Sequence, residues 1–147
     1  MPDRRVIHVL SSLQIGGAER LVVDLADLQR RRGLAPLILS FGRDSDPLCA
    51  VARAQGIEVL SLGEVGTSFG KMRVLHRTLQ AREPTALHVH TPWCMPRLAL
   101  LLPFFKGSVV YTRHGAHSYD SLYWRTLHRW VHNFVDHLTF VSEQSAG

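Results

Sequence analysis

Short apolar runs alternate with longer amphipathic segments along the chain. Residues 6–10 form the first run, whose β-branched side chains are typical of a strand buried in a parallel sheet. Apolar side chains then recur at helical spacing up to Gly33, where we expect the helix to end. The alternation continues and predicts five more strands, at residues 35–41, 57–62, 85–90, 108–113 and 137–141.

Further helices are expected between these runs. One is predicted over 47–55, and another carries Met72, Leu75 and Leu79 and stops near Glu83, just before a proline. The remaining two are expected at 96–105, where Pro103 shortens or kinks the helix, and at 119–135. Strands and helices in such alternation require right-handed crossovers, so we expect an α/β fold: a doubly wound, Rossmann-like parallel sheet of about six strands with helices on both faces.

Unusual residues follow four of the predicted strands. In such sheets, ligands bind beyond the carboxyl ends of the strands, near the point where the strand order reverses. The residues there are Gly16–Gly17, His90–Thr91, His114–Gly115 and Ser142–Glu143. We therefore expect a ligand site at this rim.

The glycine pair Gly16–Gly17 joins the first strand to the first helix. Unpaired N–H groups at a helix N-terminus attract anions, and two residues without Cβ let a bulky anion such as a diphosphate approach. The pair lacks the GxGxxG spacing of dinucleotide folds and the lysine of P-loops. A purely structural turn is the alternative interpretation.

Composition limits the class of protein more than its function. With 147 residues, of which 46% are hydrophobic and 20% charged, the chain is expected to form one soluble globular domain. The sequence lacks a membrane-spanning run and a secretory leader, which favours a cytoplasmic location. Its net charge of +5 favours anionic partners, without choosing among phosphates, phospholipid surfaces and nucleic acid. Cys49 and Cys94 are expected to be free thiols.

Two kinds of catalytic centre are not supported by the spacing of residues. A metal site could be drawn from His88, His90, Cys94, His114 and His117. His88 and His90 form one closely spaced pair of ligands, but the sequence holds no second such pair as a structural zinc site requires, so we expect no metal. A Cys94–His90 nucleophile lacks an orienting third group and an oxyanion motif.

The last predicted helix has two contrasting faces. Its apolar stripe is expected to be core and consists of Tyr123, Leu127, Trp130, Val131 and Phe134. The opposite face is either a solvated cationic surface or a contact with anionic lipid, and it carries Arg125, His128, Arg129 and His132.

Four segments together resemble a known family. The runs HVLSSLQIGGAER, ALHVHTPW, VVYTRHGAH and LTFVSEQSA, in this order and spacing, are similar to the N-terminal half of retaining GT-B glycosyltransferases of family four. The resemblance covers almost the whole chain. It implies that residues 1–147 are the acceptor-side Rossmann-like domain, that the C-terminal donor-binding domain is absent from this chain, and that neither metal nor cofactor is needed. The fragment alone is then expected to be inactive.

The resemblance also implies roles for single residues. Gly16 and Gly17 would approach the diphosphate of a nucleotide-sugar donor, and His114 would contact the transferred sugar near the reacting centre. The acceptor side would be lined by Glu19, Arg20, His90 and Thr91. In retaining members the donor phosphate helps to deprotonate the acceptor hydroxyl, so catalysis is mainly positioning and stabilisation of the leaving diphosphate.

Several partners and one rival function remain open at this point. The expected acceptor is a glycan or a lipid-linked molecule, which would place the protein peripherally on the inner face of a membrane. Trp93 and the apolar segment 95–105 make self-association of the isolated domain plausible. Nucleic-acid binding is not expected, because no recognised module interleaves arginine with aromatic residues. The rival is a non-catalytic module that binds a nucleotide or an anionic glycan.

Overall fold

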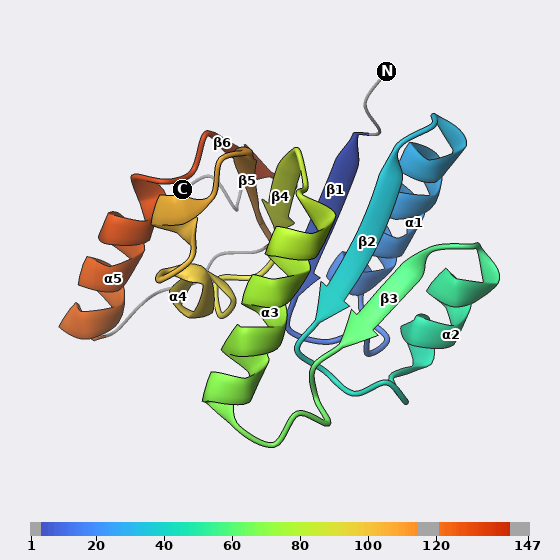
Figure 1. Cartoon of the computed structure of the whole chain (residues 1–147), viewed down its shortest axis with the longest axis horizontal. Helices are drawn as coiled ribbons and strands as arrows, with labels where there is room; N and C mark the ends of the chain where they lie inside the picture. The colour runs from blue at the N-terminus through green and yellow to red at the C-terminus, as the bar shows by residue number, and fades with distance from the viewer. Residues whose placement is uncertain (1–3, 115–120, 142–147) are drawn as a thin grey trace.

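Six parallel strands form one sheet in the computed structural model, which describes residues 4–114 and 121–141. The strands are β1 (Arg5–Leu10), β2 (Ala35–Ser40), β3 (Glu58–Ser61), β4 (Ala86–Val89), β5 (Ser108–Arg113) and β6 (His137–Phe140). Their order across the sheet is β3-β2-β1-β4-β5-β6 (Figure 1). The doubly wound parallel sheet predicted from the sequence is therefore confirmed.

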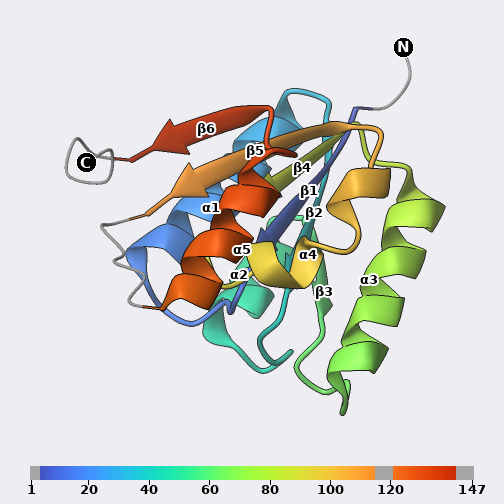
Figure 2. The same ribbon diagram turned by 90° about the vertical axis from the view of Figure 1, so that its left-hand side faces the viewer.

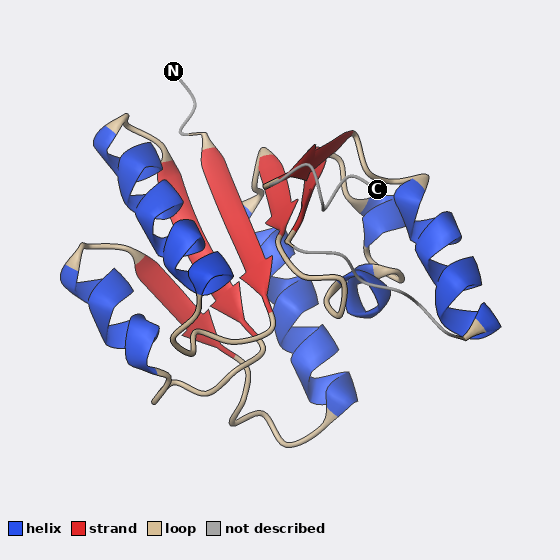
Figure 3. Ribbon diagram, turned by 180° about the vertical axis from the view of Figure 1, so that it is seen from behind, coloured by secondary structure: helices blue, strands red, loops and turns tan. Residues whose placement is uncertain are grey.

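Helices cover both faces of this sheet. They are α1 (Gly17–Arg31), α2 (Pro47–Ala54), α3 (Ser68–Arg82), α4 (Met95–Leu98), the 3₁₀ turn η1 (Leu102–Phe104) and α5 (Leu122–His132). Figure 1 shows α3 in front of the sheet, and Figure 3, seen from behind, shows α1 and α2 in front of it. In Figure 2, α4 lies between α5 and α3. Each face has its own apolar core, one beneath α1 and α2 and the other beneath α3, α4 and α5.

The ends of the first two helices follow the glycine signals in the sequence. Gly33 and Gly56 have φ angles of +83° and +78°, a left-handed conformation that glycine adopts without strain. By contrast, α3 begins earlier than the sequence analysis placed it. The Gly70 N–H donates to Thr67 Oγ1 at 2.9 Å, so Thr67 caps a first turn that precedes Met72, the first apolar position from which the helix was predicted.

The helix expected at 96–105 is wrong in its extent. The chain instead forms the four-residue α4 and, after a turn, η1. Pro103 supplies the reason, because it has no N–H to donate to the carbonyl of Ala99 and its ring would clash there in a continuous helix. The break leaves Leu100 and Phe104 exposed, at 75% and 83%, while Met95 and Leu98 are fully buried.

Part of the sequence analysis concerns residues outside the described ranges. These are Gly115, His117, the expected helix start at Tyr119, and the segment from Ser142. Within the described part of the chain, no helix is both long and apolar enough to cross a membrane.

The two faces of α5 differ from those expected. His128, assigned to the cationic face, is only 6% exposed, whereas Tyr123 and Trp130, assigned to the core, are 69% and 41% exposed. Val131 is fully buried, as expected. His128 therefore adds little charge to this surface, and the cationic face reduces to Arg125 and Arg129 with His132.

Acid should destabilise the fold through His128. Burial, together with the charges of His132 and Arg113, lowers the pKa of His128 to about 4 from 6.5. The unfolded chain therefore binds this proton more tightly than the folded chain does. The contribution of neutral His128 to the free energy of unfolding is complete above pH 6.5 and is lost as the pH falls towards 4, by up to about 3 kcal/mol. In His128→Gln, urea unfolding at a series of pH values should show a shallower loss of stability over this range. If stability fell with pH as steeply in His128→Gln as in the wild-type protein, His128 would not be a source of the acid sensitivity.

Candidate functional site

The carboxyl ends of β1, β4 and β5 lie side by side, because these strands are neighbours in the sheet. The order reverses here, with α1 leaving β1 towards β2 while β4 lies on its other side. The residues that follow the three strands therefore meet at one crevice. They are the β1–α1 loop, His90–Thr91 and His114.

The N-terminus of α1 is open towards this crevice. Gly16 precedes the helix with an extended backbone, and no side chain caps it. A Cβ placed on Gly17 would meet no heavy atom within 4 Å, so the space beside Gly17 is free. Free N–H groups and open space are the properties of a helix N-terminus that binds an anion.

Glu19 lies against this turn. A Cβ placed on Gly16 would lie 2.2 Å from Glu19 Oε2, so the carboxylate packs directly over the glycine. Its negative charge complements the positive end of the α1 dipole in the absence of another anion. A diphosphate approaching Gly16 would have to displace the Glu19 side chain.

Asp46 holds the β1–α1 loop from the neighbouring loop. Its Oδ2 accepts the Leu13 N–H at 3.1 Å and its Oδ1 accepts the Gln14 side-chain N–H at 2.5 Å. The Leu48 N–H also donates to the Leu13 carbonyl at 3.0 Å. Asp46 is 5% exposed. Sequence reasoning missed this residue, because it lies in a cluster of turn-forming residues whose contact with the first loop is not local.

Replacing Asp46 by alanine should weaken both the fold and the site. The buried Leu13 N–H would lose its acceptor, at a cost of about 1–3 kcal/mol in the free energy of unfolding. The loop before Gly16 would also lose its anchor, so anion binding at α1 should weaken. Thermal unfolding and ligand titration measure the two effects.

The matched control is Asp44→Ala. Asp44 is in the same loop, but its ion pair with Arg53 is exposed to solvent, so its loss should change the stability of the fold little. Equal effects of the two substitutions would contradict the role given to Asp46.

His114 lies half-buried at the end of β5 and is electrostatically coupled to Glu19. Burial lowers the pKa of His114, and the opposing effect of Glu19 is smaller, so the imidazole is neutral at pH 7. Among the described residues, its Nε2 is buried without a hydrogen-bond partner. A neutral imidazole with a free nitrogen beside an anion site can contact a polar, uncharged group.

The other residues assigned to the rim are placed differently from one another. Arg20 forms an ion pair with Asp24 at 3.2 Å along the exposed face of α1. The Thr91 hydroxyl donates to Cys94 Sγ at 3.0 Å. His90 is 2% exposed, and its Nε2 lies 3.0 Å from His8 Nδ1. The structure thus brings Gly16, Glu19 and His114 together, while Arg20 points elsewhere and His90 lies beneath the rim.

His8 is a second residue that the sequence analysis missed. It is fully buried in the middle of β1 and opposite His88 in the register of β1 with β4. The signal was a single polar residue inside an otherwise apolar strand, which is costly unless the side chain is hydrogen-bonded.

Cys94 cannot serve as a nucleophile in this arrangement. It is fully buried, and burial raises the pKa of its thiol to about 11. The reactive thiolate is therefore scarce at pH 7. A pocket of about 660 Å³ lies at the opposite end of the strands, around the end of α3 and the amino ends of β4 and β5, away from this chemistry.

The comparisons with known proteins agree with this fold. A family model described as Glycosyltransferase Family 4 matches residues 15–147. No curated protein sequence matches the chain. This chain covers only 32–42% of the length of the similar solved structures.

Three of these structures illustrate the likeness. HepE of Anabaena, crystallised with UDP-glucose, has a TM-score of 0.69 and 18% identity over 91% of this chain and 36% of its own. A glycosyltransferase from Rickettsia africae has a TM-score of 0.67 and 13% identity, over 82% of this chain and 32% of its own. MurG of Acinetobacter baumannii has a TM-score of 0.63 and 10% identity, over 97% of this chain and 42% of its own. At these identities the likeness establishes the fold.

Proposed function

The chain belongs to glycosyltransferase family 4, and we propose that it is the acceptor-side half of a transferase that moves a sugar from a nucleotide-diphosphate donor. The observation that carries the proposal is the open N-terminus of α1 at Gly17, beside the neutral imidazole of His114. A second Rossmann-like domain would hold the nucleotide across the crevice. HepE, which has this fold, was crystallised with UDP-glucose.

Each residue at the rim has a role in this proposal. Gly16 and Gly17 admit the donor diphosphate to the N–H groups of α1, which stabilise the charge that develops on the leaving group. His114 contacts the transferred sugar. The donor phosphate takes the proton of the acceptor hydroxyl on the same face, so the anomeric configuration is retained without a protein nucleophile.

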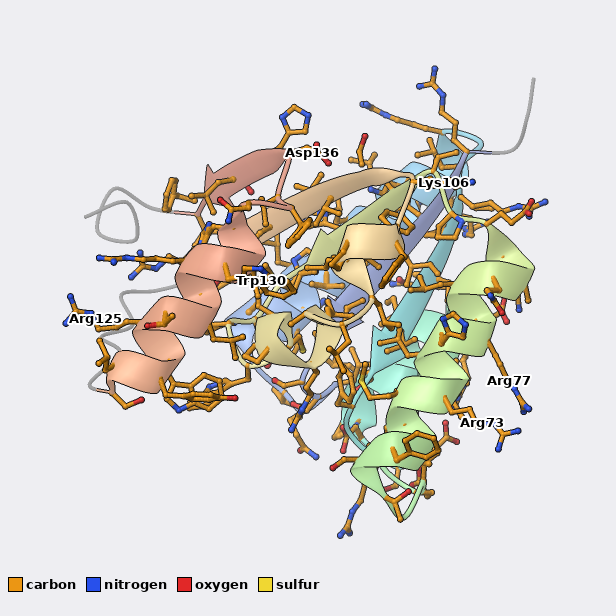
Figure 4. The ribbon with its side chains drawn as sticks, turned by 60° about the vertical axis from the view of Figure 1, so that its left-hand side comes forward. Arg73, Arg77, Lys106, Arg125, Trp130 and Asp136 are labelled. Carbon is orange, nitrogen blue, oxygen red and sulfur yellow. The ribbon has the colours of Figure 1, made fainter. Side chains whose placement is uncertain are left out.

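The acceptor is proposed to be a glycan or a lipid-linked molecule. It would bind near Glu19 and Thr91, the members of the predicted acceptor side that lie at the rim, whereas Arg20 is paired with Asp24 along α1 and His90 lies beneath the rim and would support it from below. For a lipid-linked acceptor, the protein would lie on the inner face of a membrane, where Arg125 projects outward from α5 (Figure 4). Binding to anionic vesicles that falls with added salt would support this placement.

Self-association through Leu100 and Phe104 also stays a prediction, and sedimentation at several concentrations tests it.

The test of function uses the protein that contains both domains. It is incubated with a panel of UDP- and GDP-sugars and with glycan acceptors, and release of the nucleoside diphosphate and transfer of the sugar are both measured. We expect acceptor-dependent release, with the new linkage in the anomeric configuration of the donor. Tight nucleotide binding without transfer would favour the rival function, a non-catalytic binding module. Inversion of configuration would overturn the mechanism.

A further inference from the structure

Three histidines converge inside the molecule, below the proposed transfer site. His8 comes from the middle of β1, and His88 and His90 come from the end of β4. One ring nitrogen of each lies within 4.8 Å of the other two. The sequence analysis argued against a metal because it considered ligands close along the chain, whereas the third imidazole is 80 residues away and is added by strand pairing.

The separations between these rings suit one metal ion. His8 Nδ1 and His90 Nε2 are 3.0 Å apart, and the His88 and His90 ring centroids are 3.9 Å apart. Two nitrogens bound to one tetrahedral Zn²⁺ are about 3.3 Å apart, given a Zn–N length of about 2.05 Å. All three nitrogens lie within 4.8 Å of one another, so the rings would have to rotate and close the longer separations by up to about 1.5 Å to share one ion.

The outer nitrogens of two of these rings are already held. His8 Nε2 lies 2.7 Å from Gln29 Oε1 on α1, and His88 Nε2 lies 2.6 Å from Thr112 Oγ1 on β5. Thr112 Oγ1 is in turn 2.6 Å from Thr139 Oγ1 on β6. Metal-binding histidines typically use the second ring nitrogen in this way, which fixes the tautomer and leaves the other nitrogen for the ion. Here that leaves Nδ1 of His8 and Nδ1 of His88.

The third ring, that of His90, has a buried nitrogen without a hydrogen-bond partner among the described residues. His90 is 2% exposed, and its Nδ1 has no hydrogen-bond partner among the described residues. Burial lowers the pKa values of all three histidines, so each imidazole is neutral and able to donate a lone pair at pH 7. A metal ion bound at Nε2 of His90, the nitrogen that faces His8 Nδ1, would place the ring proton on Nδ1, the position without a protein partner among the described residues.

We propose that His8, His88 and His90 form a binding site for one Zn²⁺-class ion, which links β1 to β4 beneath the crevice. Three neutral imidazoles suit Zn²⁺ and its neighbours Co²⁺ and Ni²⁺, while the hard ions Mg²⁺ and Ca²⁺ prefer oxygen. Water completes the coordination. The ion fixes the ring of His90, whose centroid is 5.8 Å from that of His114, so the site supports the rim without taking part in sugar transfer.

The test measures metal binding directly, so its outcome does not depend on the proposed function. The untagged chain is freed of metal with a chelator and titrated with Co²⁺ and Zn²⁺. We expect one equivalent of Co²⁺ to give the intense visible bands of a tetrahedral site, Zn²⁺ to displace it, and Zn²⁺ to raise the Tm. Mg²⁺ at the same concentration should do neither.

Substitutions identify the ligands. His88→Ala should weaken Co²⁺ binding by more than about 100-fold, and Thr112→Val and Gln29→Leu, which remove outer partners, should weaken it by about 10- to 100-fold. The control His76→Ala removes an exposed histidine on α3 and should bind Co²⁺ normally. The two outer variants keep the test valid if His88→Ala does not fold. Absence of stoichiometric binding, or binding that is unchanged in Thr112→Val, Gln29→Leu and His88→Ala, would overturn the proposal.

Discussion

Replacing His114 by alanine in the two-domain protein should lower kcat by about 100-fold or more, with a smaller change in donor affinity. His114 is half-buried beside Glu19 at the end of β5, so part of its ring is exposed at the rim where the reacting sugar would lie, although its Nε2 is itself buried. A contact that strengthens in the transition state affects kcat more than binding. Steady-state kinetics and donor titration measure the two quantities.

The matched control is His137→Ala, which removes an exposed histidine at the start of β6. It should leave kcat and donor affinity unchanged. If His114 were only structural, His114→Ala would lower the Tm and leave turnover per folded molecule nearly intact. Normal turnover in a folded His114→Ala protein would therefore withdraw His114 from the site.

Replacing Gly17 by valine should weaken donor binding by at least about tenfold, which corresponds to about 1.4 kcal/mol, while the fold survives. A Cβ at this position meets nothing within 4 Å, so the substitution creates no internal clash. Valine is also a better helix former than glycine. Its branched side chain would occupy the space through which a diphosphate reaches the N-terminus of α1. Calorimetric titration with the nucleotide-sugar measures the loss.

Gly66→Val provides the comparison for this substitution. Gly66 lies in the loop between β3 and α3, and a Cβ there also meets nothing within 4 Å. Donor affinity should be unchanged in Gly66→Val. Wild-type affinity in Gly17→Val would mean that the glycine pair has only a conformational role in the turn.

The fold could be predicted because its signals are local. A few consecutive β-branched residues indicate a buried parallel strand. Gly33 and Gly56 mark helix ends through their own backbone conformation. The errors were also local. Thr67 was not recognised as a helix cap, and the strength of Pro103 as a helix breaker was underestimated.

The site could be predicted only in part, because its remaining contacts depend on pairing between distant segments. Gly16 and His114 were found because Gly16 lies in the short loop between β1 and α1, and His114 directly follows β5. Asp46 acts on Leu13, 33 residues away, and His8 meets His90 at a separation of 82 residues. Neither relation exists until the register of β1 against its neighbours is known. A single polar residue in an apolar strand is the one signal that pointed to His8.

The central place of β1 also has a consequence during synthesis of the chain. Arg5 pairs with Ala35 on one side, but Val6 pairs with Ala86 on the other. During synthesis β1 therefore gains β2 as a neighbour early and keeps its other edge free until β4 emerges. An unpaired edge of this kind can add strands from other chains, and distant pairings form slowly. Substitutions that weaken the β1–β4 seam should accordingly reduce the yield of soluble protein more than they reduce the stability of the molecules that do fold.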